Sequence, residues 1–226
     1  MPVRLCYHKA MIKDLFDFDL SFEKQIVGTD EAGRGPASGG VFAAAVAFVE
    51  PPSKELLQNL GKLNDSKKLS KKNREDLYDF IKLNTVNKVV CVEVREIEQF
   101  NILNSSLKAM RLACEDVISR LKDMDSLTLV DGNKLIRNYK YPQQYIIKGD
   151  GKSASIAAAS ILAKVERDWY MEKLDLEFPE YNWKQNSGYL TKQHIEAIQK
   201  FGVTKYHRRS FLKNILGEDK QLTIFN

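Results

Sequence analysis

The chain has 226 residues, of which 43% are hydrophobic, and its 35 Lys and Arg against 30 Asp and Glu give a net charge of +5. This is the composition of a globular protein with room for a sizeable core, and the small basic excess fits a polyanion-binding surface without requiring one. The longest apolar run, residues 41–49, is too short to span a bilayer, and the first ten residues lack the apolar core of a signal peptide. We therefore expect a cytoplasmic protein with no membrane partner.

Three segments are expected along the chain. Residues 1–24 mix large apolar side chains with acids and should form an ordered extension packed on the domain that follows. Residues 25–214 form that domain, and residues 215–226 form a C-terminal tail. The three cysteines are odd in number and in no metal-ligand pattern, which favours reduced, structural thiols.

The sequence is organised around residues 25–49, which read QIVGTDEAGRGPASGGVFAAAVAFV. Two apolar runs flank a glycine-rich segment, and both runs are typical of buried strands. Asp30 and Glu31 are neighbours, and neighbours in a regular strand point to opposite faces, so we expect the chain to leave the pleat if both serve one site. Gly33 and Gly35 supply backbone freedom for such a turn and for the close approach of a ligand.

Two other interpretations compete for this segment. One is a β-hairpin with a long polar loop whose acids are solvated. The other is the acidic box of a nucleotide-dependent helicase, which needs a phosphate-binding loop of the pattern G-x-x-x-x-G-K-[ST]. The last three positions of this pattern, G-K-[ST], are matched only at residues 151–153. The pattern would then require a glycine at position 146, where this sequence has Ile146. The helicase interpretation is therefore disfavoured.

Local signals predict further elements downstream. Ser53, Ser70 and Thr191 each stand where a side chain can cap the N-terminus of a helix. Residues 156–163, IAAASILA, are apolar on almost every side, so the helix that contains them should begin deep in the core. Hydrophobic spacing predicts strands over residues 86–94, 127–130 and 145–148, and helices over residues 54–60, 104–122, 154–178 and 192–201.

Two more acids follow predicted strands. Asp131 comes directly after residues 127–130, and Asp150 comes shortly after residues 145–148. Open α/β sheets bind ligands at the carboxyl ends of their strands, although an acid in a plain turn is the alternative for each position. If the strands are neighbours, four carboxylates converge with no His or Cys among them, and such a set selects Mg²⁺ or Mn²⁺. Two such ions can activate water and stabilise a leaving oxygen, which indicates phosphodiester hydrolysis.

Three polar segments are candidates for contacts with nucleic acid. Ser66 and Lys67 lie in a basic loop that is either a solvated turn or, placed near the acids, a phosphate-binding segment. Tyr189 lies in a glycine-containing loop. Residues 206–211, YHRRSF, mix aromatic and basic side chains, which suits stacking and phosphate contact; the alternative is a helix start with two exposed arginines.

Six motifs occur in a fixed order between residues 26 and 211. They are GTDEAGRGP (28–36), NDSKKLS (64–70), LVDGN (129–133), KGDGKSASIAAASILAKVERD (148–168), SGYLTKQH (187–194) and HRRSF (207–211). The ordered set resembles the type 2 ribonuclease H family, and most closely its bacterial ribonuclease HII members.

The resemblance implies an α/β, ribonuclease H-like fold: a mixed central sheet flanked by helices, with a helical C-terminal part. It implies that Asp30, Glu31, Asp131 and Asp150 are the catalytic, metal-binding carboxylates. The backbone of Gly33, Arg34 and Gly35 would contact a ribose 2′-hydroxyl, and Tyr189 would stack on the deoxyribose that follows. Phosphate contacts would come from Ser66, Lys67, Lys152, Ser153 and Ser155.

The activity implied is that of an endoribonuclease that uses Mg²⁺ or Mn²⁺. It would cut the RNA strand of RNA–DNA hybrids and cut 5′ to ribonucleotides embedded in duplex DNA, leaving 3′-hydroxyl and 5′-phosphate ends. The alternative from another class is a non-catalytic hybrid-binding module that kept the fold. A missing carboxylate would mark such a module, and all four are present.

The tail ends in QLTIF, residues 221–225, with three apolar side chains close to the last residue. The pattern is similar to the Gln-Leu-x-Leu-Phe peptide by which bacterial replication and repair proteins dock on the sliding clamp, with Ile224 in place of leucine. A groove on a clamp would bury Leu222, Ile224 and Phe225, while Gln221 would hydrogen-bond its rim. The alternative is that the tail folds back on the domain's own surface.

Overall fold

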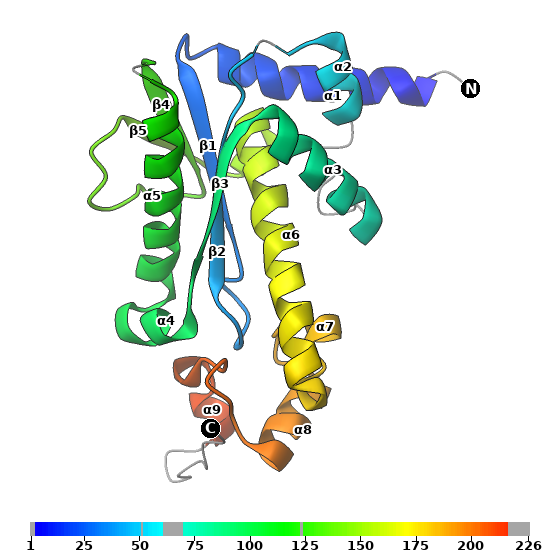
Figure 1. Ribbon diagram of the computed structural model, residues 1–226, viewed down its shortest axis with the longest axis vertical. Helices are drawn as coiled ribbons and strands as arrows, with labels where there is room; N and C mark the ends of the chain where they lie inside the picture. The colour runs from blue at the N-terminus through cyan, green and yellow to red at the C-terminus, as the bar shows by residue number, and fades with distance from the viewer. Residues whose placement is uncertain (1–2, 51, 61–69, 123, 217–226) are drawn as a thin grey trace.

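The centre of the molecule is a five-stranded mixed sheet (Figure 1). The computed structural model describes residues 3–50, 52–60, 70–122 and 124–216. The strands are β1 (Gln25–Ala32), β2 (Val41–Ala47), β3 (Val86–Val92), β4 (Ser126–Asp131) and β5 (Gln143–Ile146). Their order in the sheet is β3-β2-β1-β4-β5; β2 is antiparallel to β1 and β3, whereas β4 is parallel to β1 and β5. The predicted mixed sheet is confirmed.

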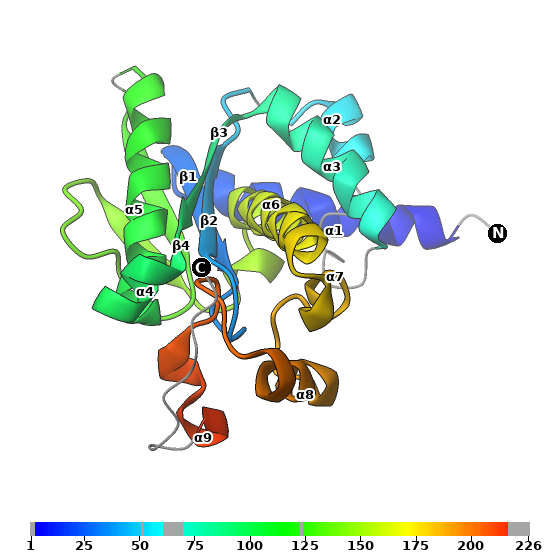
Figure 2. The same cartoon turned by 60° about the horizontal axis from the view of Figure 1, so that its bottom comes forward.

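Helices cover both faces of this sheet (Figure 2). α5 (Ile102–Arg120) packs on β1, β2 and β3 from one side, and α6 (Ala154–Glu177) packs on β1 and β2 from the other. α1 (Val3–Leu20) and α3 (Lys71–Asn84) lie against α6. Further helices are α2 (Lys54–Asn59), α4 (Val94–Phe100), α7 (Trp183–Asn186), α8 (Lys192–Phe201) and α9 (Lys213–Leu216), with the short 3-10 helices η2 (Gly149–Gly151), η3 (Pro179–Tyr181) and η4 (Arg209–Phe211).

The apolar run in β2 is explained by burial on both faces. Ala44 and Val46 pack with α6 on one side, while Ala43, Ala45 and Ala47 pack with α5 on the other. Every residue of β2 is buried, so the strand shows no alternation of polar and apolar side chains.

β1 and α6 cross at Gly28 without an intervening side chain. A Cβ atom on this glycine would lie 2.2 Å from the carbonyl carbon of Ser155 and 2.3 Å from the backbone nitrogen of Ile156. Glycine is the residue that allows a strand and the start of a helix to approach so closely. Residues two apart in a strand share a face, so the crossing also places the first turns of α6 beside Asp30.

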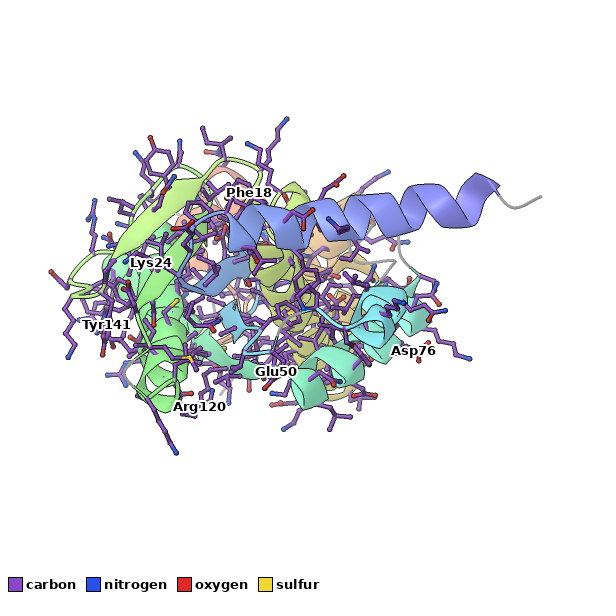
Figure 3. All side chains as sticks on the ribbon, turned by 90° about the horizontal axis from the view of Figure 1, so that it is seen from above. Phe18, Lys24, Glu50, Asp76, Arg120 and Tyr141 are labelled. Atoms are coloured by element: carbon purple, nitrogen blue, oxygen red, sulfur yellow. The ribbon has the colours of Figure 1, made fainter. Side chains whose placement is uncertain are left out.

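α1 lies across the end of the molecule at which β1 begins (Figure 3), and Phe18 is near the point where it joins β1. Ile12, Leu15 and Phe16 are buried in one core cluster with apolar residues of α6. Asp19 is buried as well, and one of its carboxylate oxygens accepts a hydrogen bond of 2.9 Å from the backbone N–H of Ser155. The C-terminal half of this helix therefore contributes to the core.

The predicted helix caps are confirmed, whereas two strand boundaries differ from the prediction. The side-chain oxygens of Ser53, Ser70 and Thr191 cap α2, α3 and α8, each 3.0–3.3 Å from a backbone nitrogen three residues further on. The strand predicted over residues 86–94 ends at residue 92 because α4 starts at residue 94, and the strand predicted over residues 145–148 lies earlier, as β5.

The helical C-terminal part is attached to the last turns of α6 and lies beyond one end of the sheet (Figure 1). Met171 and Leu174 of α6 form a separate core cluster there with Tyr181, Trp183 and Ile198. None of the helices in the described residues combines the length and the apolar character that a membrane span requires.

Candidate active site

Four carboxylates line a single cleft of about 450 Å³. Asp30 and Glu31 come from β1, Asp131 from the end of β4, and Asp150 from η2. The parallel pairing of β1 with β4 ends at residues 29 and 130, so three of the acids follow directly after it. The cleft therefore lies at the carboxyl ends of two parallel strands, where open α/β sheets bind ligands.

The expectation that the chain leaves the pleat at the two neighbouring acids is wrong. β1 stays paired with β2 as far as Ala32, which lies opposite Phe42. Asp30 and Glu31 can both border the cleft because the pairing of β1 with β4 has already ended there. The chain turns one residue after the strand instead, at Gly33, which has a φ of +98°.

Asp150 lies in a tight turn and not, as expected, at the end of a strand. β5 stops at Ile146, and the turn η2 connects it to α6. Asp131 holds this turn against β4, because its Oδ1 accepts a hydrogen bond of 2.6 Å from the backbone N–H of Gly149. A Cβ on Gly149 would lie 3.1 Å from the same oxygen and 2.5 Å from the side chain of Ile156. Glycine at this position thus brings Asp150 close to the other acids.

Burial and repulsion between charges raise the pKa of Asp30, Glu31 and Asp131. Asp30 is only 9% exposed, and its pKa is raised well above the usual range, first by burial and then by the charges of Glu31, Asp131 and Asp150. Burial also raises the pKa of Asp131. It raises that of Glu31 too, although Arg34, whose Nη1 lies 3.1 Å from Glu31 Oε1, opposes the shift. A bound cation would relieve this repulsion.

The donor atoms of the cleft fit a hard divalent cation. They are carboxylate oxygens, which Mg²⁺ and Mn²⁺ prefer. Within the described ranges, no three His, Cys, Asp or Glu side chains yet stand close enough together to hold an ion. The carboxylates already have partners in the protein: Glu31 accepts from Arg34, Asp131 from the backbone of Gly149, and Asp30 from the backbone of Glu31. A bound ion would therefore compete with Arg34 for the carboxylate of Glu31.

The loop of residues 33–40, here called the glycine loop, and Tyr189 border the same cleft. Gly33, Arg34 and Gly35 follow β1 directly, and a Cβ on Gly35 would lie 3.2 Å from Cε1 of Tyr189. The tyrosine is 53% exposed and lines the cleft together with the acids. The structure thus brings together the glycine-rich backbone of residues 33–35, the exposed ring of Tyr189 and four carboxylates.

The residues predicted to contact phosphates differ in their positions. Ser66 and Lys67 lie outside the described residues. Lys152 is exposed at the start of α6. Ser153 and Ser155 are 0% and 2% exposed: the first caps α6, and the second donates its backbone N–H to a carboxylate of α1. In this structure the two serines are buried and stabilise the start of α6, so they are not exposed to a phosphate.

Three basic residues of the cleft were not predicted. Arg74, Lys164 and Arg167 line it, and Arg167 is almost fully buried. Lys164 and Arg167 are three residues apart on α6, so they share one face of that helix. Their position directly after the apolar run of residues 156–163 was the available signal.

Residues 206–211 are not the surface patch that the sequence predicted, nor the start of a helix with two exposed arginines. His207 and Arg208 are 2% and 0% exposed, whereas Arg209 is exposed. Arg208 is buried because backbone carbonyls of the glycine loop surround its guanidinium group, which donates to four of them.

Comparison with known proteins gives a consistent result. The family model Ribonuclease HII matches residues 27–214. Ribonuclease HII of Fusobacterium nucleatum is 45% identical over 216 residues, which cover 95% of this chain and 98% of that protein. Ribonuclease HII of Pelagibacter ubique is 48% identical over 190 residues, which cover 83% of this chain and 96% of the relative.

Solved structures share the fold. The ribonuclease HII chain in a PCNA:RNase HII complex from Archaeoglobus fulgidus matches with a TM-score of 0.64 at 26% identity, over 81% of this chain and 93% of that chain. A ribonuclease HIII, Bst-RNase HIII in complex with Mn²⁺, matches with a TM-score of 0.63 at 15% identity, over 89% of this chain and 67% of that chain. The chain belongs to the ribonuclease HII family, a family of ribonuclease H endonucleases.

Proposed function

We propose that the protein is a metal-dependent endoribonuclease that cuts the RNA strand of RNA–DNA hybrids and also cuts 5′ to ribonucleotides embedded in duplex DNA. The observation that carries the proposal is the convergence of Asp30, Glu31, Asp131 and Asp150 in one cleft, beside the glycine loop and Tyr189. The related ribonuclease HIII that was solved in complex with Mn²⁺ supports the use of a divalent cation.

The four carboxylates would hold Mg²⁺ or Mn²⁺. Bound there, the cations would supply an activated water and stabilise the leaving oxygen, so that 3′-hydroxyl and 5′-phosphate ends are left. The protein's own contribution is to hold the acids in place. The bond from Gly149 to Asp131 fixes two of the segments that carry them, and the pairing of β1 with β2 fixes the third.

Sugar recognition would fall to the backbone of residues 33–35 and to Tyr189. A 2′-hydroxyl can approach a glycine backbone closely, and the tyrosine ring can stack on a deoxyribose while crowding a ribose. Arg34 would leave Glu31 when a cation binds and could then contact the nucleic acid. Lys164 and Arg74 of the cleft wall, together with Lys152, Ser66 and Lys67, would contact phosphates.

Cleavage of a labelled duplex with one embedded ribonucleotide tests this function. We expect one cut, 5′ to the ribonucleotide, in Mg²⁺ or Mn²⁺ and none in EDTA. The matched control is the same duplex made of DNA alone, which should stay intact. Cutting of the control, cutting in EDTA, or no cutting of either duplex in either metal would contradict the proposal.

We further propose that residues 25–214 form the catalytic unit and that residues 221–225 dock on a sliding clamp. These tail residues lie outside the described part of the chain, so the support comes from their sequence and from the archaeal ribonuclease HII that was solved in a complex with PCNA. Calorimetric titration with the cognate clamp is the test. Replacing Leu222 and Phe225 together by Ala should abolish binding and leave cleavage unchanged. Equal binding by this variant, or no binding by the wild type, would contradict docking without affecting the catalytic proposal.

A further inference from the structure

A single C-terminal segment, residues 204–208, reaches both loops that border the cleft. Its Arg208 contacts the glycine loop of residues 33–40, and its His207 reaches the loop of Tyr189 through a second histidine. We infer that these are positioning contacts, which hold the backbone that contacts the ribose and the ring that stacks on the deoxyribose at a fixed separation. The inference rests on the proposed function. It assigns the positioning of the groups that contact the two sugars to three buried residues, Arg208, His207 and His194.

Arg208 fixes the glycine loop from inside. A guanidinium group presents its donors in a rigid planar fork, which a lysine ammonium group does not reproduce. Burial lowers the pKa of Arg208 to about 9, so it remains charged at neutral pH. Its side chain donates to the carbonyls of Gly39 (2.8 Å from Nε), Gly40 (3.0 Å from Nη2), Pro36 and Arg34 (2.8 and 3.3 Å from Nη1), and its backbone N–H donates to Ala37 at 2.7 Å.

A chain of hydrogen bonds runs from Thr204 to the backbone of Tyr189. The N–H of Thr204 donates to Nδ1 of His207 at 2.9 Å, so the proton of this imidazole is on Nε2, which lies 3.2 Å from Nε2 of His194. The indole N–H of Trp183 donates to the same His194 nitrogen at 3.0 Å. That nitrogen is therefore an acceptor, and the proton of His194 is on Nδ1, which donates to the Tyr189 carbonyl at 2.9 Å.

These hydrogen bonds, each donated in the direction from Thr204 to Tyr189, require both imidazoles to be neutral. Burial lowers the pKa of His194, and burial together with the neighbouring histidine lowers that of His207 to about 3. A protonated His194 would carry a second proton on Nε2, facing two donors. The neutral pair thus offers its single free donor to the loop of Tyr189.

Arg167 joins the two loops directly. Its Nη2 donates to the carbonyl of Ser187 at 3.0 Å and to that of Ser38 at 3.3 Å. A Cβ on Gly33 would lie 2.2 Å from its Nε, so the loop rests against this side chain. The loops are therefore tied to each other as well as to residues 204–208.

Two replacements of His194 separate positioning from packing. The amide of asparagine reaches the place of the imidazole Nδ1, and that of glutamine reaches the place of Nε2. Both remove the ring, but His194→Asn keeps a donor for Tyr189 and His194→Gln does not. The readout is kcat for a duplex with one ribonucleotide divided by kcat for an RNA–DNA hybrid of the same sequence, where the next sugar is not deoxyribose.

We expect His194→Gln to lower this ratio roughly ten- to hundredfold, the range set by the loss of one stacking contact, and His194→Asn to stay within about threefold of wild type. Tyr189→Ala should lower the ratio as much, and adding His194→Gln to it should lower the ratio no further, because the histidine acts through the tyrosine. Equal ratios in the Asn and Gln variants, or additive losses in the double variant, would overturn the positioning role of the histidines.

Arg208→Lys tests the contact with the glycine loop independently. The inference can therefore still be tested if a His194 variant does not fold. It should lower kcat on both substrates about tenfold or more while KM changes less than about threefold, and the exposed Arg209→Lys should match wild type. Unchanged kcat in folded Arg208→Lys would overturn its role. Failure of the wild type to cut either substrate would instead contradict the proposed function.

Discussion

Asp30 occupies a position that opposes folding. Its carboxylate is buried between β1 and α6, and three further acids raise its pKa. One hydrogen bond, from the backbone N–H of Glu31 to Oδ1 at 2.7 Å, stabilises the charge. Groups with strongly raised pKa values in a cleft are typical of catalytic sites, where repulsion is kept because a cation or substrate relieves it.

Replacing Asp30 by Asn should therefore separate activity from stability. Cleavage should fall about 10²- to 10⁴-fold because a proposed metal ligand is lost, while duplex affinity at fixed salt should stay within about threefold. In EDTA, the free energy of unfolding should rise by about 1 kcal/mol, because a buried, repelled charge is removed. Asp79→Asn, a change at an exposed acid of α3, is the control for both measurements. Turnover near that of wild type would remove Asp30 from the metal site.

At the scale of helices and strands, the sequence predicted the features that depend on residues close together in the chain. Ser53, Ser70 and Thr191 were recognised as helix caps because the signal lies within three residues of each. The course of β1 through Asp30 and Glu31 was not predicted, because it depends on the pairing with β2 and on where the pairing with β4 ends.

The crossing of β1 and α6 predicts a sharp response to one methyl group. Gly28→Ala would place a Cβ 2.2 Å from the backbone of α6, so helix or strand must move, and the free energy of unfolding should fall by about 3 kcal/mol or more. Gly151→Ala is the matched control, since a Cβ there meets nothing within 4 Å and should change stability by less than about 1 kcal/mol. Urea unfolding of the two variants gives both values. A Gly28→Ala protein as stable as wild type would show that the crossing is not tight.

At the scale of the whole molecule, contacts between distant segments were beyond the sequence prediction. The four acids of the cleft were singled out because each belongs to a short motif. Arg208 was assigned to the surface because its partners are backbone carbonyls about 170 residues away, and every residue has a carbonyl, so no pattern marks them. Asp19 was given no role for the same reason: its partner is the backbone N–H of Ser155, 136 residues further on.

Asp19 links the first helix to the core through a charge that the fold disfavours. Burial raises its pKa from 3.8 to about 6, against the hydrogen bonds from Ser153 and Ser155, and its Oδ1 is buried without a hydrogen-bond partner. Between these two pH values, the folded protein holds a proton that the unfolded chain releases. A group with a raised pKa contributes stability at low pH and loses it as the pH rises through the folded value.

The difference in unfolding free energy between wild type and Asp19→Asn should therefore fall by about 2 kcal/mol from pH 4 to pH 7, since a shift of one pKa unit corresponds to about 1.4 kcal/mol and the unfolded carboxylate is already more than half ionised at pH 4. The variant is needed because His207, whose pKa is lowered to about 3, acts in the opposite direction: its contribution is present above about pH 6.5 and is lost as the pH falls. Urea unfolding in EDTA at several pH values measures the difference, and the exposed Asp14→Asn controls for a change of charge on α1. Parallel stability curves for wild type and Asp19→Asn would show that the carboxylate is solvated, and that α1 is held by its apolar residues alone.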